Sequence, residues 1–343
     1  MLSVVPRNNP LIMNAPTEKR LVTLSTNSAA LRQLVTWLSL VPSTLFAVSF
    51  FGHWSDWAEL LVNFQVQFLI MLVPCPVVLF WLGARRRAAV LAAVAICCAW
   101  GVGKIYFPAT QPPAGPNSLR IMSYNVLGTN LQFEAVAKEI SHFNPDVLVI
   151  LEFTQNWEQA LRVFHDRYPH RVTEPRWHGF GIAVFSKLPI EDFSIIDSTQ
   201  RRADLPIIRA RFKFHERFIE LIGLHFVSPL NGNRMSLRNL QFRELAKELA
   251  SRTGPRIVVG DFNCTTWSNH FREFLLQTQL RDSRQGFGLQ ATWAPSYLPL
   301  QIPIDHALVS REIHVHDRQI GERNGSDHRP VIIDLSISQS SVD

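Results

Sequence analysis

The fold of this chain is decided by the stretch Arg256-Ile-Val-Val-Gly-Asp-Phe-Asn263. Its apolar run followed by a glycine predicts a buried strand that ends at a turn. A carboxylate, Asp261, and a carboxamide, Asn263, stand at that turn, two positions apart. In an extended backbone such residues face the same side, so we expect both side chains to point into one site. This pair is suited to orienting and deprotonating a water molecule, although Asp and Asn are also common turn residues.

Short apolar strands and amphipathic helices surround this stretch from residue 119 onward. We expect strands at 119–126, 147–151, 181–186, 193–196, 207–214, 218–225, 257–261, 304–309, 314–320 and 331–337. We expect helices at 131–143, 155–168, 234–251 and 268–277. Several neighbouring strands have no helix between them, which favours an α+β layered domain over 119–338 rather than a regular βαβ winding.

Three long apolar runs precede this domain, at residues 34–51, 62–83 and 88–107. Buried helices of a large core would also give apolar runs, but three in succession with short links favour about three transmembrane helices over 34–107. The polar residues 1–33 are expected to form a flexible cytoplasmic tail. A Pro/Ala/Gln-rich linker is expected over 108–118.

Charge is distributed unevenly along the chain. Residues 1–107 hold 8 of the 34 basic and 3 of the 28 acidic residues, which leaves 26 basic and 25 acidic residues in the remainder. A near-neutral domain argues mildly against a dedicated duplex-binding enzyme. The arginine link 85–87 and the acidic link 52–61 place the tail in the cytoplasm and the later domain on the opposite face. Only one cysteine, Cys264, lies in that domain, so no disulfide framework is expected there.

Polar residues stand at or beside the ends of several predicted strands. They are Asn125, Glu152, His225, Asp261, Asn263, Asp305, Asp327 and His328. Each by itself is more typical of a turn or a cap. Together they offer carboxylates for a hard cation, a base for water and imidazoles for developing negative charge. This set indicates metal-assisted hydrolysis of a phosphoester.

The same residues, in the same order, resemble a known superfamily. The most specific pieces are Gly260-Asp-Phe-Asn263 and Ser326-Asp-His-Arg-Pro330, supported by Tyr124-Asn125, Glu152, Gly223-Leu-His225 and Ile304-Asp-His306. The chain resembles the endonuclease/exonuclease/phosphatase (DNase I-like) superfamily over about residues 120–335, and more narrowly its membrane-tethered bacterial branch. The resemblance implies a four-layer α/β/β/α sandwich with the site at the mouth between two sheets. It also implies a multi-pass protein of a bacterial inner membrane, in which the charged links would place the catalytic domain on the periplasmic face.

The resemblance implies a role for each site residue. Glu152 would be the main metal ligand, with Asn125 and Asp327 around the metal, which would be Mg²⁺ or alternatively Mn²⁺. Asp261 would activate water, oriented by Asn263. His328 would bind the scissile phosphate and be held by Asp305, with His225 as a second imidazole; Asn125 and Asn263 would also contact the substrate.

These roles describe a membrane-tethered, Mg²⁺-dependent phosphoesterase, with phosphodiester cleavage favoured over monoester cleavage. Nucleic acid, a phospholipid headgroup and a small phosphorylated metabolite all suit the core as substrates, the lipid bilayer is the expected partner, and no protein partner is expected. Leu127 and Leu151 depart from the pattern of abasic-site endonucleases and weaken that assignment. The alternative is a catalytically silent, membrane-anchored interaction platform with the same fold. A transport unit finds no support, because the apolar runs lack interior acids and arginines.

Overall fold

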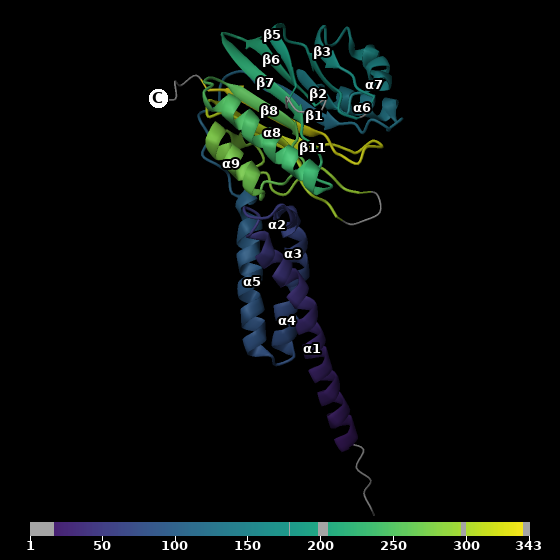
Figure 1. The fold of residues 1–343 in the computed structure, drawn as a ribbon, viewed down its shortest axis with the longest axis vertical. Coiled ribbons are helices and arrows are strands. Elements are labelled where there is room, and N and C mark those ends of the chain that lie inside the picture. Colours follow the sequence, from purple (N-terminus) through teal and green to yellow (C-terminus); the bar gives the residue numbers. More distant parts are fainter. Residues whose placement is uncertain (1–16, 178, 198–204, 296–299, 339–343) are drawn as a thin grey trace, which may run out of the picture.

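The computed structural model describes residues 17–177, 179–197, 205–295 and 300–338. It shows a rod of helices that carries a layered α/β domain at one end (Figure 1). The helical rod is built from the first part of the chain and the domain from the rest, as the change of sequence pattern near residue 119 predicts.

The rod contains α1 (Thr17–Ser49), α2 (Asp56–Leu61), η1 (Val62–Phe64), α3 (Gln65–Leu72), α4 (Pro74–Trp81), α5 (Arg85–Gly103) and η2 (Lys104–Tyr106). Three stretches are long and apolar enough to cross a membrane, namely Ser28–Ser49, Asp56–Trp81 and Arg85–Tyr106. Pro74 interrupts the second of them, because proline has no N–H to donate within a helix, so α3 ends and α4 begins there.

The flexible tail expected over residues 1–33 is wrong for its second half. Helix α1 already begins at Thr17, and residues 1–16 lie outside the described part of the chain. The residues between Thr17 and Leu34 mix polar side chains with good helix formers such as Leu, Ala, Glu, Lys and Arg, and they extend the apolar helix that follows.

The domain contains two mixed sheets. Its strands are β1 (Leu119–Asn125), β2 (Val147–Leu151), β3 (His170–Glu174), β4 (Ile182–Ser186), β5 (Ile190–Asp197), β6 (Pro206–Phe214), β7 (Arg217–His225), β8 (Arg256–Asp261), β9 (Arg281–Asp282), β10 (Asp305–Val309), β11 (Ile313–Ile320) and β12 (Val331–Ile337). One sheet has the order β11-β12-β1-β2-β4-β3 and the other β5-β6-β7-β8-β10-β9. The helices are α6 (Phe133–Phe143), α7 (Gln155–Ala160) with η3 (Leu161–Phe164), α8 (Gly232–Ala250) and α9 (Asn269–Thr278).

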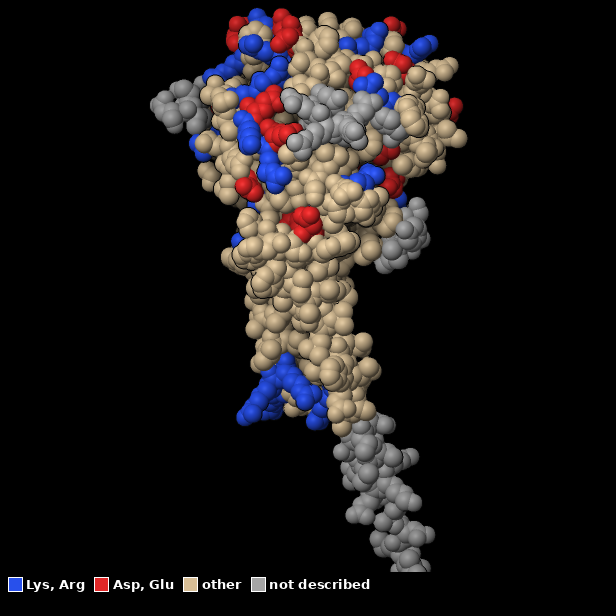
Figure 2. All heavy atoms as spheres, viewed as in Figure 1, with Lys and Arg blue, Asp and Glu red and all other residues tan. Residues whose placement is uncertain are grey.

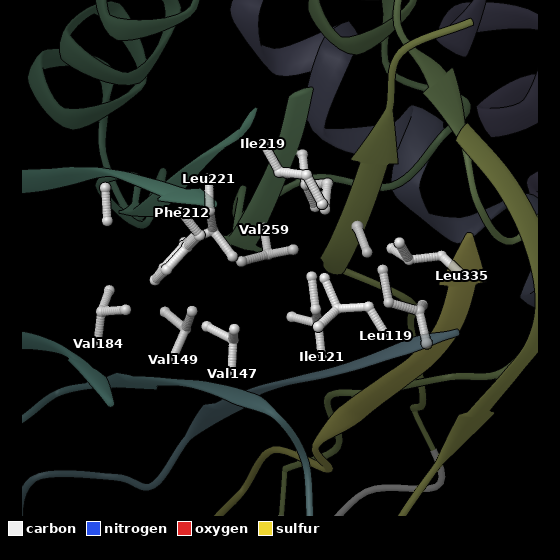
Figure 3. Packing of buried hydrophobic residues seen from close by; sticks show 14 of the residues in the cluster. Leu119, Ile121, Val147, Val149, Val184, Phe212, Ile219, Leu221, Val259 and Leu335 are labelled. Atoms are coloured by element: carbon white, nitrogen blue, oxygen red, sulfur yellow. The ribbon is translucent and has the colours of Figure 1, made fainter. Parts of the chain in front are cut away.

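The two sheets pack face to face through an apolar core. Leu119, Ile121 and Val147 of the first sheet meet Leu221 and Val259 of the second in this layer (Figure 3). A second cluster packs α6 and α7 on the outer face of the first sheet, and a third packs α8 and α9 on the outer face of the second. The expected four-layer α/β/β/α sandwich is therefore confirmed.

Strand pairing brings distant parts of the chain to one edge. Strands β1 and β2 are parallel neighbours, so their carboxyl ends meet. Strands β7 and β8 are also parallel, with His225 opposite Asp261. Strand β10 is antiparallel to β8 and starts with Asp305 opposite Asp261. The polar strand ends of both sheets thus lie at the same side of the sandwich.

Most expected elements are present, with local differences. Strands β3 and β9 were not predicted, and the helix expected over 155–168 gives way to a 3₁₀ turn after Ala160. The linker packs on the domain. The side chain of Gln111 exchanges two hydrogen bonds with the backbone of Val315, and Gly115 N donates to Ser336 Oγ.

Candidate active site

The first sheet contributes Asn125 and Glu152, which lie side by side at the carboxyl ends of the neighbouring strands β1 and β2. Asn125 ends β1, and Glu152 is the residue after β2. Asn125 Nδ2 donates to Glu152 Oε1 at 3.1 Å, and Gly128 N donates to Glu152 Oε2 at 2.9 Å. Glu152 has a φ of 56°, a left-handed conformation that is uncommon for glutamate and turns its side chain back over the strand ends.

The second sheet contributes Asp261, whose carboxylate links the two sheets. Its Oδ2 accepts a hydrogen bond from Asn125 Nδ2 at 3.4 Å. The same oxygen lies 3.5 Å from His225 Nε2 and 3.7 Å from His328 Nε2. One buried carboxylate oxygen therefore contacts an amide and two imidazoles from three other strands and loops.

His328 and Asp305 form a buried ion pair. Their Nδ1 and Oδ2 atoms are 2.8 Å apart. Thr292 Oγ1 accepts the backbone N–H of Asp305 at 3.0 Å, and Ser326 Oγ accepts that of His328 at 3.0 Å. Both partners are held at the backbone, so the imidazole is fixed with Nε2 facing Asp261.

Burial and neighbouring charge separate the pKa values of these groups. Burial raises the pKa of Asp261 well above its usual range, and the Asp305 carboxylate raises it further. Burial lowers the pKa of His225, so this imidazole is neutral. Burial would also lower the pKa of His328, but Asp305 and Asp261 outweigh it and raise that pKa to about 10. A buried carboxyl group with a raised pKa thus lies between a neutral and a charged imidazole, a division typical of acid–base sites.

Asn263 lies beside Asp261, but not through the extended backbone on which the expectation rests. The backbone is not extended there, because Asn263 has a φ of 51°. Its N–H donates to Asp261 Oδ1 at 2.8 Å, and its Nδ2 donates to Phe226 O at 2.8 Å. The left-handed turn, which Asn tolerates, is what keeps this residue beside Asp261.

Asp327 directly precedes His328 in a loop, and only one of its two carboxylate oxygens accepts a hydrogen bond from the described residues. Trp293 Nε1 donates to Asp327 Oδ2 at 2.9 Å. The other oxygen, Oδ1, is buried and has no hydrogen-bond partner among the described residues. A buried carboxylate oxygen without a donor is the kind of atom that a bound cation would satisfy.

Two sets of residues are candidates for a metal. Ligand atoms of Asp261, Asp305 and His328 all lie within 4.8 Å of one another. In this set His328 Nδ1 is already engaged by Asp305 Oδ2 at 2.8 Å, so the three groups are held together by an ion pair as they stand. Glu152 and Asp327 offer carboxylate oxygens, which hard cations prefer. The amide of Asn125 presents Nδ2 to Glu152 and would have to turn its oxygen there to become a ligand.

Several positioning residues escaped the sequence analysis. Thr292 and Trp293 hold Asp305 and Asp327. Arg318, fully buried, donates to the backbone oxygen of Asp305 at 3.4 Å, and Arg238, also buried, donates to that of Asn263 at 3.0 Å. Nothing in their local sequence distinguishes them from ordinary residues. What sets the two arginines apart is that they are buried and hydrogen-bonded, and a sequence pattern does not show either property.

Comparison with known proteins assigns the fold. A model of the endonuclease/exonuclease/phosphatase family matches residues 122–328. No curated protein matches the chain. An endonuclease/exonuclease/phosphatase from Beutenbergia cavernae is 16% identical, with 66% of this chain and 73% of that chain covered and a TM-score of 0.56.

Two further solved structures have the same fold. The 3′ phosphatase NExo from Neisseria, bound to a product DNA hairpin, is 21% identical, with 63% of this chain and 98% of that chain covered and a TM-score of 0.54. Truncated TDP2 from Caenorhabditis elegans is 15% identical, with 65% of this chain and 100% of that chain covered and a TM-score of 0.53. All three similarities concern the fold.

Proposed function

Because the chain belongs to the endonuclease/exonuclease/phosphatase family, we propose that it is a metal-dependent phosphoesterase anchored in a membrane and acting on phosphodiesters. The observation that carries the proposal is the environment of Asp261. Its carboxylate contacts Asn125, His225 and His328, and thereby joins the ends of both sheets in one site.

Glu152 and Asp327 would hold the cation, with Asn125 beside them. The orphaned Oδ1 of Asp327 and the carboxylate at the end of β2 suit Mg²⁺, or alternatively Mn²⁺. When bound, the cation would neutralise charge on the phosphate oxygens and polarise the phosphorus centre. Gly179 lies against this carboxylate, since a Cβ there would lie 3.4 Å from Glu152 Oε2.

Asp261 takes the proton from the attacking water. Its raised pKa makes it a stronger base than an ordinary aspartate. Asn263, held through Nδ2 by Phe226, has its side-chain oxygen left to orient that water. The attack forms the new phosphorus–oxygen bond, and the ester oxygen leaves as the old bond breaks.

The two imidazoles act on the phosphate. His328 is charged, and its Nδ1–H is donated to Asp305, so Nε2–H is the donor available to a phosphoryl oxygen. His225 is neutral, and its Nδ1 has no hydrogen-bond partner among the described residues. This nitrogen is suited to a hydrogen bond with the substrate or with the leaving oxygen.

The membrane anchor is supported by the helical rod. Exposed apolar side chains cover its surface, and basic residues gather at the end away from the domain (Figure 2). Arg32 and Arg85–Arg87 line that end. The positive-inside rule then favours a cytoplasmic position for this end and a periplasmic position for the catalytic domain.

The decisive experiment assays the full chain, purified in detergent, on DNA, RNA, phospholipids and sugar phosphates, with Mg²⁺ and with chelator. We expect hydrolysis of a phosphodiester that needs the cation. The interaction-platform alternative predicts no turnover on any substrate class, with Mg²⁺ or with chelator. Its support would be a folded protein, with normal melting, that is inactive throughout the panel.

A further inference from the structure

Helix α2, at the domain end of the rod, presents a polar face to the catalytic domain. Asp56, Glu59 and Asn63 follow one another at spacings of three and four residues, so they lie on one side of the α2–η1 segment. Glu59 is 1% exposed and Asn63 6% exposed, although both stand at the start of a candidate membrane span. Buried polar groups in such a place need partners, and all their partners described below lie in the domain or in its loops.

Glu59 caps helix α9. Its Oε1 accepts hydrogen bonds from Ser268 Oγ at 2.5 Å and from Asn269 N at 2.9 Å, and its Oε2 accepts one from Asn269 Nδ2 at 3.0 Å. A carboxylate at a helix N-terminus also interacts favourably with the helix dipole. The chain passes so close to this contact at Gly52 that a Cβ there would lie 2.5 Å from Glu59 Oε2.

Asn63 holds the same loop closer to the site. Its Oδ1 accepts the backbone N–H of Thr265 at 2.7 Å. Thr265 is two residues after Asn263, and Ser268 ends the loop that starts at the site. Trp267 in the same loop packs in an apolar cluster with Val62 of η1. The loop 263–268 is therefore held along its length by the helical rod.

A third connection starts at Asp56. Its Oδ1 accepts a hydrogen bond from Asn239 Nδ2 at 3.1 Å. Asn239 Oδ1 in turn accepts from Arg238 Nη2 at 3.1 Å, and Arg238 Nη1 donates to Asn263 O at 3.0 Å. This chain of hydrogen bonds reaches the residue that orients the water in the proposed mechanism.

We propose that the polar face of α2, with Glu59 at its centre, positions the catalytic loop 263–268, so that the helical rod is a working part of the catalytic unit. This inference rests on the proposed function, because it assigns the loop its role through Asn263 and Asp261. Glu59 is a positioning residue that acts through Ser268 and Asn269. Small displacements of catalytic groups are costly, so loosening this loop lowers turnover more than substrate binding.

The test uses a variant pair in the full chain. In Glu59→Gln, the new Nε2 faces Asn269 Nδ2, and two donors oppose each other. Asn269 cannot turn its amide without losing the bond that its Oδ1 accepts from Arg272 Nη2 at 2.6 Å. Adding Asn269→Asp supplies oxygens to both the glutamine and Arg272. The double variant therefore restores the hydrogen bonds between residues 59 and 269, with the negative charge now on residue 269.

We expect Glu59→Gln to lower kcat roughly 10- to 100-fold with KM within about twofold, and the double variant to recover most of it. Amide hydrogen exchange in residues 263–269 should speed up in the single variant and return in the double. Gln111→Ala is the matched control, since it removes two hydrogen bonds between the linker and β11 and leaves α2 untouched. We expect it to change neither kcat nor exchange in the loop.

Three results would overturn the inference. The first is an unchanged kcat and unchanged loop exchange in Glu59→Gln. The second is a lower kcat and faster loop exchange in Glu59→Gln that adding Asn269→Asp does not reverse. The third is an equal decrease in kcat, with equally faster loop exchange, in Gln111→Ala. Exchange reports on the loop without turnover, so an inactive wild-type chain would remove the proposed function while the positioning by α2 is still decided.

Discussion

His306 makes the stability of the domain depend on pH. It is fully buried beside Phe271, and its Nε2 lies 2.8 Å from Cys264 O, to which it donates. Burial lowers the pKa of His306 to about 4, and the raising effect of Asp282 does not offset it. The opposite ring nitrogen, Nδ1, lies 3.9 Å from Asp282 Oδ2 and has no hydrogen-bond partner among the described residues, so a proton added there would be buried without a direct hydrogen bond.

The sign and size of the effect follow from linkage. In the unfolded chain a histidine has a pKa of about 6.5, so between pH 6.5 and pH 4 the unfolded state binds more protons than the folded state. Stability is therefore complete above about pH 7 and falls as the pH falls through this window. From pH 7.5 to pH 5, a folded pKa of about 4 costs about 2 kcal/mol, which corresponds to a decrease in Tm of about 4–8 °C for a domain of this size.

The assay is thermal melting of the wild type and His306→Gln in detergent at several pH values between 5 and 7.5. Glutamine keeps a donor for the backbone oxygen of Cys264 but does not titrate. We expect a lower Tm for the variant at pH 7.5, because ring packing is lost, and a flatter pH dependence. Other histidines contribute equally to both proteins, so identical pH dependences would refute the reasoning.

The remaining predictions concern the metal, the coupling of the site and the topology. Glu152→Gln keeps the shape of the side chain and removes its charge, so the affinity for Mg²⁺ and turnover should fall together in a metal titration; unchanged values would remove Glu152 from the metal site. His328→Ala should lower turnover, and combined with Asp261→Asn it should be far less than multiplicatively impaired, because both residues act in one step. Fully multiplicative losses would separate their roles. A phosphatase that is active only outside the cytoplasm should be active when fused after Asp343, and a fluorescent protein that folds only in the cytoplasm should stay dark there. The reverse pattern would mean that one of the three apolar stretches does not span the membrane.

The fold was largely predictable because its signals are local. Buried strands such as Val147–Leu151 and Val331–Ile337 are short apolar runs between turn residues, and the structure has both with the expected bounds. Strand β3 carries His, Arg, Thr and Glu at an edge and is half exposed, so its sequence lacks the apolar pattern. The start of α1 was missed because residues after Thr17 are polar although they are good helix formers.

The site was predictable as a set of residues but not as a geometry. Asp261, His225 and Asp305 stand at strand ends, and strand pairing brings them together. Which atoms meet depends on turns such as the left-handed one at Asn263, for which the sequence offers only a preference. The contacts of Glu59 with the start of α9 join residues that are 209 or more positions apart in the sequence. They connect the apolar helical rod to the polar layered domain. No local pattern predicts such a contact.

Turnover of Asp261→Asn is the measurement that tests the central claim most directly. Asparagine has nearly the same shape and can keep the hydrogen bond from Asn263 N, but it cannot take a proton. With saturating Mg²⁺ and the substrate found in the panel, we expect a loss of about 10²–10⁴ in rate, equal to roughly 3–5 kcal/mol in the barrier, and a Tm close to that of the wild type. A wild-type rate in this variant, with a normal melt, would contradict the hydrolytic mechanism.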